Sequence, residues 1–146
     1  MEFSFSIAKQ KIDNITILFS VVLSYLCFLN GQEKSMKTIA QFLSEHNRSI
    51  HAVSVHATVR QALELMAEKN IGALVVLEGQ QLVGMFSERD YARKVALKGK
   101  SSVDTQVRDI MTAQVITVAP QDSADHCMQL VTDSRIRHLP VLDGDQ

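Results

Sequence analysis

The residues most able to do chemistry stand together in Gly84-Met85-Phe86-Ser87-Glu88-Arg89-Asp90. An apolar strand is expected to end at Phe86 and a helix to begin after Ser87, and the first N–H groups of a helix have no partner within it. Such an N-terminus can hold a phosphate group, to which Ser87 would add a hydroxyl and Arg89 a positive charge. Asp90 has two acceptor oxygens, which suit the vicinal hydroxyls of a ribose. The stretch could therefore contact a phosphate and a ribose.

A purely structural role also fits these residues. Ser-x-x-Asp at a helix start is a capping pattern, in which the Ser87 hydroxyl accepts a hydrogen bond from the N–H of Asp90. The two roles are compatible, because a capping serine can still face solvent. Both interpretations stay open at this point.

The chain also contains an internal repeat. Val59–Gln80 reads VRQALELMAEKNIGALVVLEGQ, and Ala124–Asp145, 65 residues later, reads ADHCMQLVTDSRIRHLPVLDGD. Six of the 22 aligned positions are identical, where ordinary composition gives about one or two by chance. The identical pairs are Leu65 and Leu130, Ile71 and Ile136, Leu74 and Leu139, Val76 and Val141, Leu77 and Leu142, and Gly79 and Gly144. A fixed period indicates one supersecondary unit built twice, so the function is expected between or within the two copies.

The repeated unit is expected to combine strands and helices. In the first copy an extended stretch ends near Val55, Thr58 offers a helix N-cap, and Asn70 offers a C-terminal stop. Apolar residues at i, i+3, i+4 and i+7 predict one buried face on this helix. The remaining expected elements are strands over Ala73–Leu77 and Leu82–Phe86, a helix over Glu88–Leu97 and a polar linker over 98–106.

The second copy restarts at Val107. Its expected elements are a strand over Val115–Val118, a helix capped by Ser123 and a strand over His138–Leu142. No counterpart of the first copy's second strand and second helix follows, so we expect a C-terminally truncated fragment with an unpaired, aggregation-prone strand edge. Pro140 has no N–H, which predicts that the strand cannot pair there and leaves room for a ligand.

The first 35 residues differ from the rest. Ile15–Leu29 is a 15-residue run without charge, which is short for a membrane span of about 20 residues and lacks a signal-peptide cleavage pattern. Three interpretations stay open: a weak membrane anchor, an uncleaved signal-like segment, or sequence upstream of a true start at Met36. Residues 36–49 are expected to form a short amphipathic helix, and nothing downstream is expected to need the apolar run.

Composition and motifs exclude several functions. The chain has 146 residues and a net charge of -1, so no nucleic-acid partner is expected. Cys27 and Cys127 form no metal-ligand spacing, His126 adds none, and two cysteines favour a reducing compartment. There is no nucleophile elbow, Walker loop or dinucleotide fingerprint, and the lone carboxylates have no evident partner for acid–base work. We therefore expect neither an enzyme nor a metal site.

The order of elements and three motifs resemble a tandem pair of CBS domains, the cystathionine β-synthase regulatory repeat. The motifs are Asp109-Ile110-Met111-Thr112, Ile136-Arg137-His138-Leu139-Pro140-Val141 and the stretch Gly84–Asp90. The resemblance covers about residues 50–146 and implies an α+β (α/β) fold of two β-α-β-β-α repeats, 50–100 and 107–146. It further implies that the repeats pack as a pseudo-symmetric pair, the second incomplete, and that the chain forms a homodimer. CBS pairs also occur in inosine-monophosphate dehydrogenases, but the catalytic barrel would need roughly 200 further residues.

The resemblance also implies a ligand. Many family members bind AMP, ADP, ATP, NAD or S-adenosylmethionine between the repeats, so a regulatory adenine nucleotide is expected, without a catalytic cofactor. The implied contact residues are Ile71, Ala73, Val75, Gly84, Ser87, Arg89, Asp90, Thr117, Arg137, His138 and Pro140. By the same resemblance Asp90 would bind the ribose, and Ser87 a phosphate or the ribose. His138 has two open roles, a bond to the nucleotide or to the partner repeat. The basic residues Arg93, Lys94, Lys98 and Lys100 are expected to form a solvated helix face.

The sequence therefore predicts a regulatory module that binds an adenine nucleotide and signals to a partner protein or to its own dimer by population shift. The alternative is a ligand-free dimerisation scaffold or a membrane-tethered regulatory tail. A cytoplasmic location is expected unless Ile15–Leu29 acts as an anchor.

Overall fold

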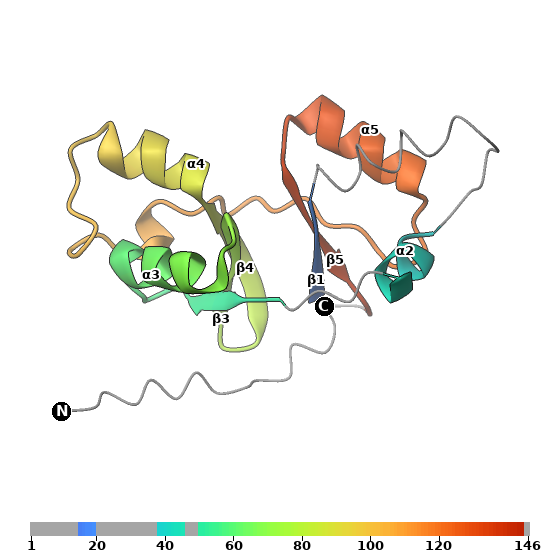
Figure 1. Cartoon of the computed structure of the whole chain (residues 1–146), viewed down its shortest axis with the longest axis horizontal. Helices are drawn as coiled ribbons and strands as arrows, with labels where there is room; N and C mark the ends of the chain where they lie inside the picture. The colour runs from blue at the N-terminus through green and yellow to red at the C-terminus, as the bar shows by residue number, and fades with distance from the viewer. Residues whose placement is uncertain (1–14, 20–37, 46–49, 145–146) are drawn as a thin grey trace.

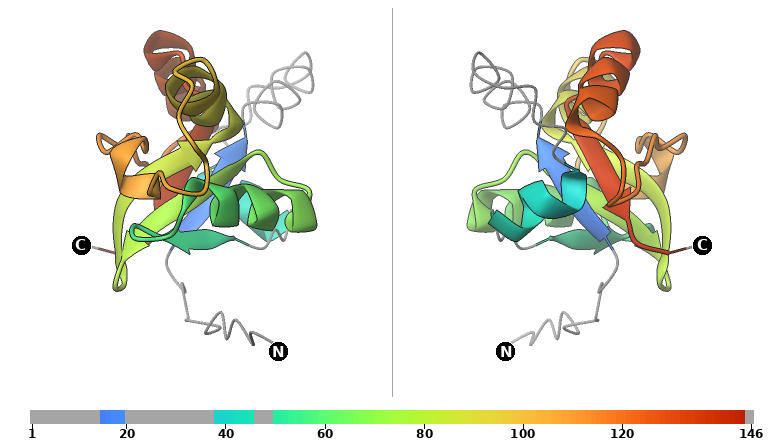
Figure 2. Two further views of the ribbon diagram at one scale, coloured as in Figure 1. Left: turned by 90° about the vertical axis from the view of Figure 1, so that its left-hand side faces the viewer. Right: turned by 90° about the vertical axis from the view of Figure 1, so that its right-hand side faces the viewer.

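The computed structural model of the chain describes residues 15–19, 38–45 and 50–144. Its elements form two groups that lie side by side (Figure 1). The first group is β2 (Ala52–Ser54), α3 (Val59–Lys69), β3 (Ala73–Glu78), β4 (Gln81–Ser87) and α4 (Glu88–Asp90), which continues as the π-helical segment η1 (Tyr91–Ala96). The second group is β1 (Ile15–Phe19), α2 (Ile39–Glu45), α5 (Ala124–Ser134) and β5 (His138–Leu142), and a short 3-10 turn, η2 (Val107–Asp109), lies on the connection. The predicted α+β fold of two related units is confirmed. Turning the molecule brings α3 to the front in one view and α2 and α5 in the other (Figure 2).

The two long helices begin and end in the same way. Thr58 caps α3 by accepting from the N–H of Gln61 at 3.2 Å, and Ser123 caps α5 by accepting from the N–H of His126 at 3.2 Å. Both caps were predicted from the sequence. Each helix then ends at a residue with a left-handed backbone conformation. These residues are Asn70 with φ 53° and Arg135 with φ 52°, and they lie 65 positions apart. The repeat therefore extends to the backbone conformation, even where the second copy has an arginine in place of the more tolerant asparagine.

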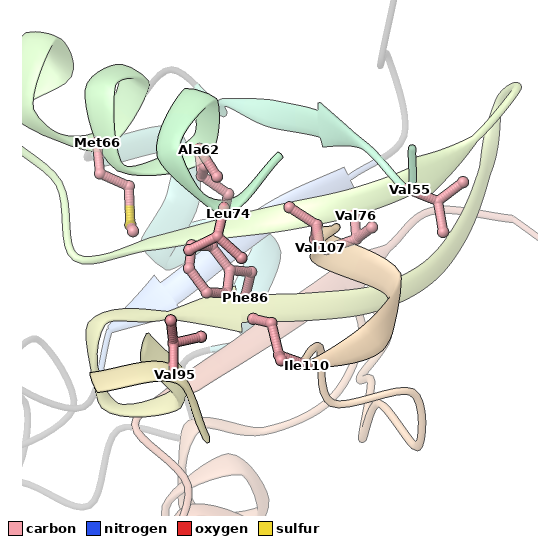
Figure 3. Close-up of a cluster of buried hydrophobic side chains, with 10 residues drawn as sticks. Val55, Ala62, Met66, Leu74, Val76, Phe86, Val95, Val107 and Ile110 are labelled. Atoms are coloured by element: carbon pink, nitrogen blue, oxygen red, sulfur yellow. The ribbon is translucent and has the colours of Figure 1, made fainter. Parts of the chain in front are cut away.

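Strand β3 is the central strand of the sheet in the first unit. It pairs parallel with β2 and antiparallel with β4, giving the order β2-β3-β4. Because successive side chains point to opposite faces, Leu74 and Val76 pack under the helices while Val75 packs on the other side. Figure 3 shows Leu74 and Phe86 at the centre of the first cluster. A strand buried on both faces explains the continuous apolar run seen in the sequence.

Apolar side chains also fill the junction between the units. This junction cluster consists of buried residues from β3 and β4 with half-buried neighbours from both units. Its buried members are Ala73, Val75, Leu77 and Met85, and Val115 and Leu142 of the second unit pack against them. Since burying apolar surface stabilises by about 25 cal/mol per Å², this contact holds the two sheets face to face as a pseudo-symmetric pair.

The segment leading into each copy packs on the other copy. Ile39 and Phe42 of α2 are buried in the core of the second unit, while Val107 and Ile110 are buried in the core of the first. The backbone bonds that hold these segments are equivalent by the repeat: Ile39 N–H to Asp122 O (2.9 Å) and Ala40 N–H to Pro120 O (2.8 Å), against Val107 N–H to Ala57 O (2.8 Å) and Arg108 N–H to Val55 O (3.2 Å). The units therefore exchange their lead segments, and neither core is complete alone.

Strand β1 pairs with β5, which corrects two expectations. The pairing is antiparallel, with Ile15 opposite Leu142 and Phe19 opposite His138. The predicted unpaired edge on β5 is therefore wrong, and so is the expectation that nothing downstream needs the apolar run. The remainder of that run and the proposed start at Met36 lie outside the described residues. Over the described ranges no helix is long and apolar enough to cross a membrane.

The strand expected over Val115–Val118 is not formed, and only Val118 makes a parallel bridge, to Val141. The N–H of Val118 donates to the carbonyl of Pro140 at 3.0 Å, and the N–H of Leu142 donates to the carbonyl of Val118 at 2.9 Å. The chain therefore does pair at Pro140, through its carbonyl, and this proline is fully buried. The expectation that β5 cannot pair there is wrong.

Two prolines explain why this ladder is short. In the first copy the ladder between β2 and β3 has a further hydrogen bond at each end. These bonds run from Val75 N–H to His51 O (3.3 Å) and from Val55 N–H to Leu77 O (3.0 Å). The residues 65 positions after the two donors are Pro140 and Pro120. Because proline has no N–H, both bonds are lost in the second copy.

Candidate functional site

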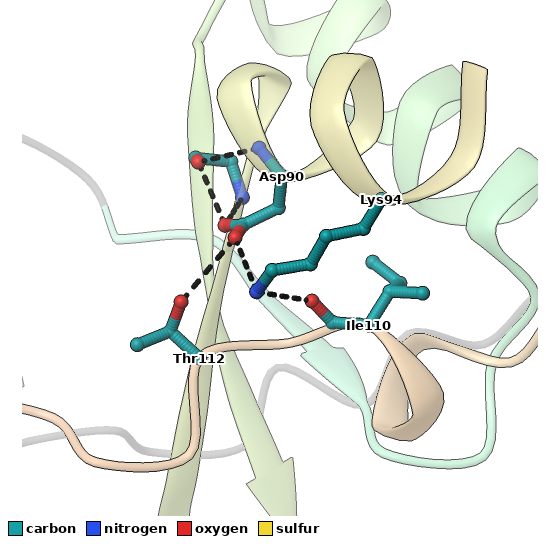
Figure 4. Close-up of polar contacts among 5 residues, drawn as sticks. Asp90, Lys94, Ile110 and Thr112 are labelled. Atoms are coloured by element: carbon teal, nitrogen blue, oxygen red, sulfur yellow. Dashed lines mark hydrogen bonds and ion pairs between the residues drawn. The ribbon is translucent and has the colours of Figure 1, made fainter. Parts of the chain in front are cut away.

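Ser87 ends β4 and caps the helix that follows. Its N–H and its hydroxyl both donate to Asp90 Oδ2, at 3.0 and 2.8 Å, and the N–H of Asp90 donates back to Ser87 Oγ at 3.3 Å. These reciprocal bonds form a capping box (Figure 4). The structural role predicted for these two residues is confirmed.

The second carboxylate oxygen of Asp90 faces the linker between the units. Lys94 Nζ lies 2.7 Å from Oδ1 and also donates to the carbonyl of Ile110 at 2.8 Å, while the hydroxyl of Thr112 donates to Oδ1 at 3.3 Å (Figure 4). The Asp90 side chain is only 13% exposed. Asp90 is therefore a hub that joins the helix start to linker residues 110–112, and we call it the Asp90 hub.

This role of Lys94 was not predicted from the sequence. Lys94 was expected to lie with Arg93, Lys98 and Lys100 on a solvated basic face, and those three residues are exposed. Lys94 is half-buried because its ammonium group turns back to the hub. The spacing of Asp90 and Lys94, four residues apart on a helix, is the signal that could have indicated the pair.

Gly84 lies where the linker crosses β4. Met85 and Thr112 exchange two backbone hydrogen bonds of 3.0 and 2.8 Å across this crossing. A Cβ on Gly84 would lie 2.5 Å from Met111 Sδ and 3.2 Å from the carbonyl oxygen of Thr112. The close approach of the linker explains the glycine, and its contact with a ligand stays a prediction.

His138 is the residue of the second unit that lies near the Asp90 hub. It is half-buried at the start of β5, and its pKa is lowered from 6.5 to about 4. Burial is the largest cause of this shift, the positive charges of Arg137 and Arg89 contribute to it, and the negative charge of Asp90 opposes it. His138 of one unit is therefore within electrostatic range of Arg89 and Asp90 of the other.

The remaining predicted contact residues fall into two groups. Ala73, Val75 and Pro140 are buried, and the first two lie in the junction cluster. Ile71 is half-buried against the core of the first unit, and Thr117 is exposed. The structure thus brings His138, with its chain neighbour Arg137, near Arg89 and the Ser87–Asp90 capping box. Ile71 precedes Gly72, whose carbonyl accepts a hydrogen bond of 3.1 Å from the N–H of Glu88 at the same helix start. No cluster of three metal-ligating side chains occurs within the described part of the chain.

The two repeated units, with a capping box and arginines near their boundary, suggest a comparison of the chain with known protein families. The family model of the CBS domain matches residues 39–97 and 107–146. The chain belongs to the CBS domain family. The two matched stretches follow the two repeats of the structure.

Individual relatives agree with this assignment. A solved signal-transduction protein with CBS domains from Burkholderia ambifaria is 50% identical, with a TM-score of 0.71, over 74% of this chain and 82% of that one. The mitochondrial CBS domain-containing protein CBSX3 of Arabidopsis thaliana is 49% identical over 90 residues, which are 58% of this chain and 44% of the plant protein. An inosine-5'-monophosphate dehydrogenase of Thermoplasma acidophilum is 29% identical over 77% of this chain but only 22% of the enzyme. The chain therefore spans less than half the length of these two curated relatives.

Proposed function

We propose that this CBS pair is a regulatory module that binds an adenine nucleotide at the boundary of its repeats, next to the Ser87–Asp90 capping box. The observation that supports the proposal most is that His138 of one unit lies within electrostatic range of Arg89 and of the capping residue Asp90 in the other, because it places the Asp90 carboxylate at the boundary of the units. The nucleotide would be a regulatory ligand, and the chain would bind it without catalysing its conversion.

The charges suit a phosphorylated ligand. Arg89 and Arg137 are exposed and belong to different units, so phosphate oxygens that reach both would link the units. The positive charges of both arginines act on the half-buried imidazole of His138. A bound anion would favour the protonated imidazole, which couples ligand binding to proton uptake.

The Asp90 hub supplies a way to transmit occupancy. A ribose hydroxyl that binds Asp90 Oδ1 must compete there with Lys94 and Thr112, both of which tie the helix to the linker. Losing either bond would favour a different linker arrangement over residues 110–112. A ligand shifts such an equilibrium only by its differential affinity for the two arrangements, so the competition at Oδ1 is the proposed switch.

Calorimetric titration of the full chain with AMP, ADP, ATP, NAD and S-adenosylmethionine tests this proposal. We expect at least one of them to bind, and Asp90→Ala to weaken binding by roughly tenfold or more, which corresponds to about 1.4 kcal/mol. Arg93→Ala, at an exposed position on η1, is the matched control and should change the affinity far less. A bound ligand should also raise the stability by about 2.7 kcal/mol at a hundredfold excess over Kd.

Failure of every nucleotide to bind at millimolar concentration would contradict the proposal. If light scattering then showed a stable dimer whose melting temperature is unchanged across the panel, the ligand-free scaffold would be the better explanation. Equal effects of the Asp90 and Arg93 substitutions would instead move the site away from the capping box.

A further inference from the structure

The carboxylate of Asp90 is fully occupied in the structure. Oδ2 accepts from the N–H and the hydroxyl of Ser87 at 3.0 and 2.8 Å, while Oδ1 faces Lys94 Nζ at 2.7 Å and the hydroxyl of Thr112 at 3.3 Å (Figure 4). The two oxygens of a carboxylate offer about four acceptor positions. A ribose hydroxyl can therefore bind Asp90 only in place of a partner that is already there.

The two partners of Oδ1 differ in charge. Thr112 is exposed and neutral, so its hydroxyl can turn to water when a ligand displaces it. Lys94 is a cation at 2.7 Å from a carboxylate whose side chain is only 13% exposed. Because charge-assisted bonds are roughly twice as strong as neutral ones, displacing Lys94 costs the ligand more than displacing Thr112.

The ammonium group of Lys94 can accept a second anion. It has three N–H donors, and within the described part of the chain it has two partners, Asp90 Oδ1 and the carbonyl of Ile110 at 2.8 Å. The Lys94 side chain is 41% exposed, so an anion in solvent can approach it. Its flexible four-carbon stem lets the charge move to a new partner near the one it leaves.

We propose that Lys94 is a specificity-determining residue that selects phosphorylated ligands at this site. A ribose hydroxyl that displaces Lys94 from Asp90 Oδ1 leaves an ammonium group without its carboxylate. A phosphate of the same ligand replaces that carboxylate, whereas a ligand without a phosphate leaves the charge uncompensated. The bond from Lys94 to the carbonyl of Ile110 then ties the phosphate to the linker. The inference rests on the proposed function and adds to it the class of ligand.

Calorimetric titration of the full chain with AMP and with adenosine tests the selection. The quantity to compare is the ratio of the two dissociation constants, which should favour AMP in the parent chain. Lys94→Met should lower this preference by roughly tenfold or more, because it removes the cation that a phosphate would bind. Thr112→Val removes the neutral partner of the same oxygen, so it should change both affinities together and leave the preference unchanged. Lys94→Arg keeps the charge and should retain most of the preference, and Arg93→Met is the exposed control.

Hydrogen exchange provides a second measurement that needs no substitution. The amides of Ile110 and Met111 donate to the carbonyl of Val107, and that of Thr112 donates to Met85, so their exchange reports on the linker. With saturating AMP, the phosphate held by Lys94 should keep this segment in place. With saturating adenosine, the same amides should exchange several times faster. Equal exchange with the two ligands would contradict the proposed role of Lys94.

The titrations separate this inference from the proposed function. The same preference for AMP in Lys94→Met and in the parent would overturn the role of Lys94 and leave nucleotide binding intact. Tighter binding of S-adenosylmethionine, which has no phosphate, than of AMP and ATP would have the same meaning. If no ligand of the panel bound, the proposed function would fail and the inference with it.

Discussion

His138 should make the stability of the fold depend on pH. Burial and the charges of Arg137 and Arg89 lower its pKa from 6.5 to about 4. Because the folded-state pKa is depressed, the unfolded chain binds more protons than the folded chain between these two values. The stabilising contribution of the neutral imidazole is therefore fully present above pH 6.5 and is lost as the pH falls toward 4.

The size of the effect follows from the two pKa values. At pH 5 an imidazole of pKa 6.5 is almost fully protonated, while one of pKa about 4 is almost fully neutral. The linkage relation then gives a loss of about 2 kcal/mol between pH 7 and pH 5. This figure is an upper bound, since the side chain is only half-buried and some water still reaches it.

Urea unfolding at pH 7 and pH 5 measures this contribution. The parent loses stability from His138 and from all other titrating groups, so the decisive quantity is the difference from His138→Gln. That variant should lose about 2 kcal/mol less than the parent over the same pH interval. His126→Gln, at an exposed position on α5, controls for the removal of one histidine. If His138→Gln and the parent lost equal stability, the proposed burial of a neutral imidazole at the unit boundary would be refuted.

Two further predictions concern the linker. Gly84→Ala should destabilise the fold by about 1–3 kcal/mol in urea unfolding, because its Cβ would meet the linker at 2.5 Å, whereas Gly72→Ala meets only a glutamate carboxylate at 3.3 Å and should cost less. Equal losses would show that the linker yields freely. Lys94→Met should speed hydrogen exchange of the amides at 110–112 by roughly tenfold, since it removes bonds of 2.7 and 2.8 Å that hold this segment. Arg93→Met is the exposed control, and unchanged exchange in Lys94→Met would contradict the Asp90 hub.

Local signals in the sequence predicted local structure well. The caps at Thr58 and Ser123, the stop at Asn70 and the apolar run of β3 each depend on residues within a few positions of one another. The capping box of Ser87 and Asp90 is of the same kind. Such features are decided by backbone hydrogen bonds and side-chain periodicity over one or two turns, which short patterns encode.

Contacts between distant segments were not predicted. Thr112 reaches Asp90 across 22 positions, and nothing in either residue's neighbourhood indicates the other. The pairing of Ile15–Phe19 with β5 joins segments more than 100 positions apart, and a five-residue apolar strand carries too little information to name its partner. Pro140 was interpreted from its missing N–H alone, although its carbonyl remained free to pair.

The sequence by itself determined that one supersecondary unit occurs twice and where its helices begin and end, and it predicted which residues could meet a ribose and a phosphate. Only the tertiary structure decided that each lead segment packs on the opposite unit, that β1 pairs with β5, and that His138 lies near Arg89 and Asp90. The physical reason is that periodicity and capping are set by neighbours along the chain. Pairing across the chain is instead selected by the burial of apolar surface and the satisfaction of backbone hydrogen bonds in the folded whole.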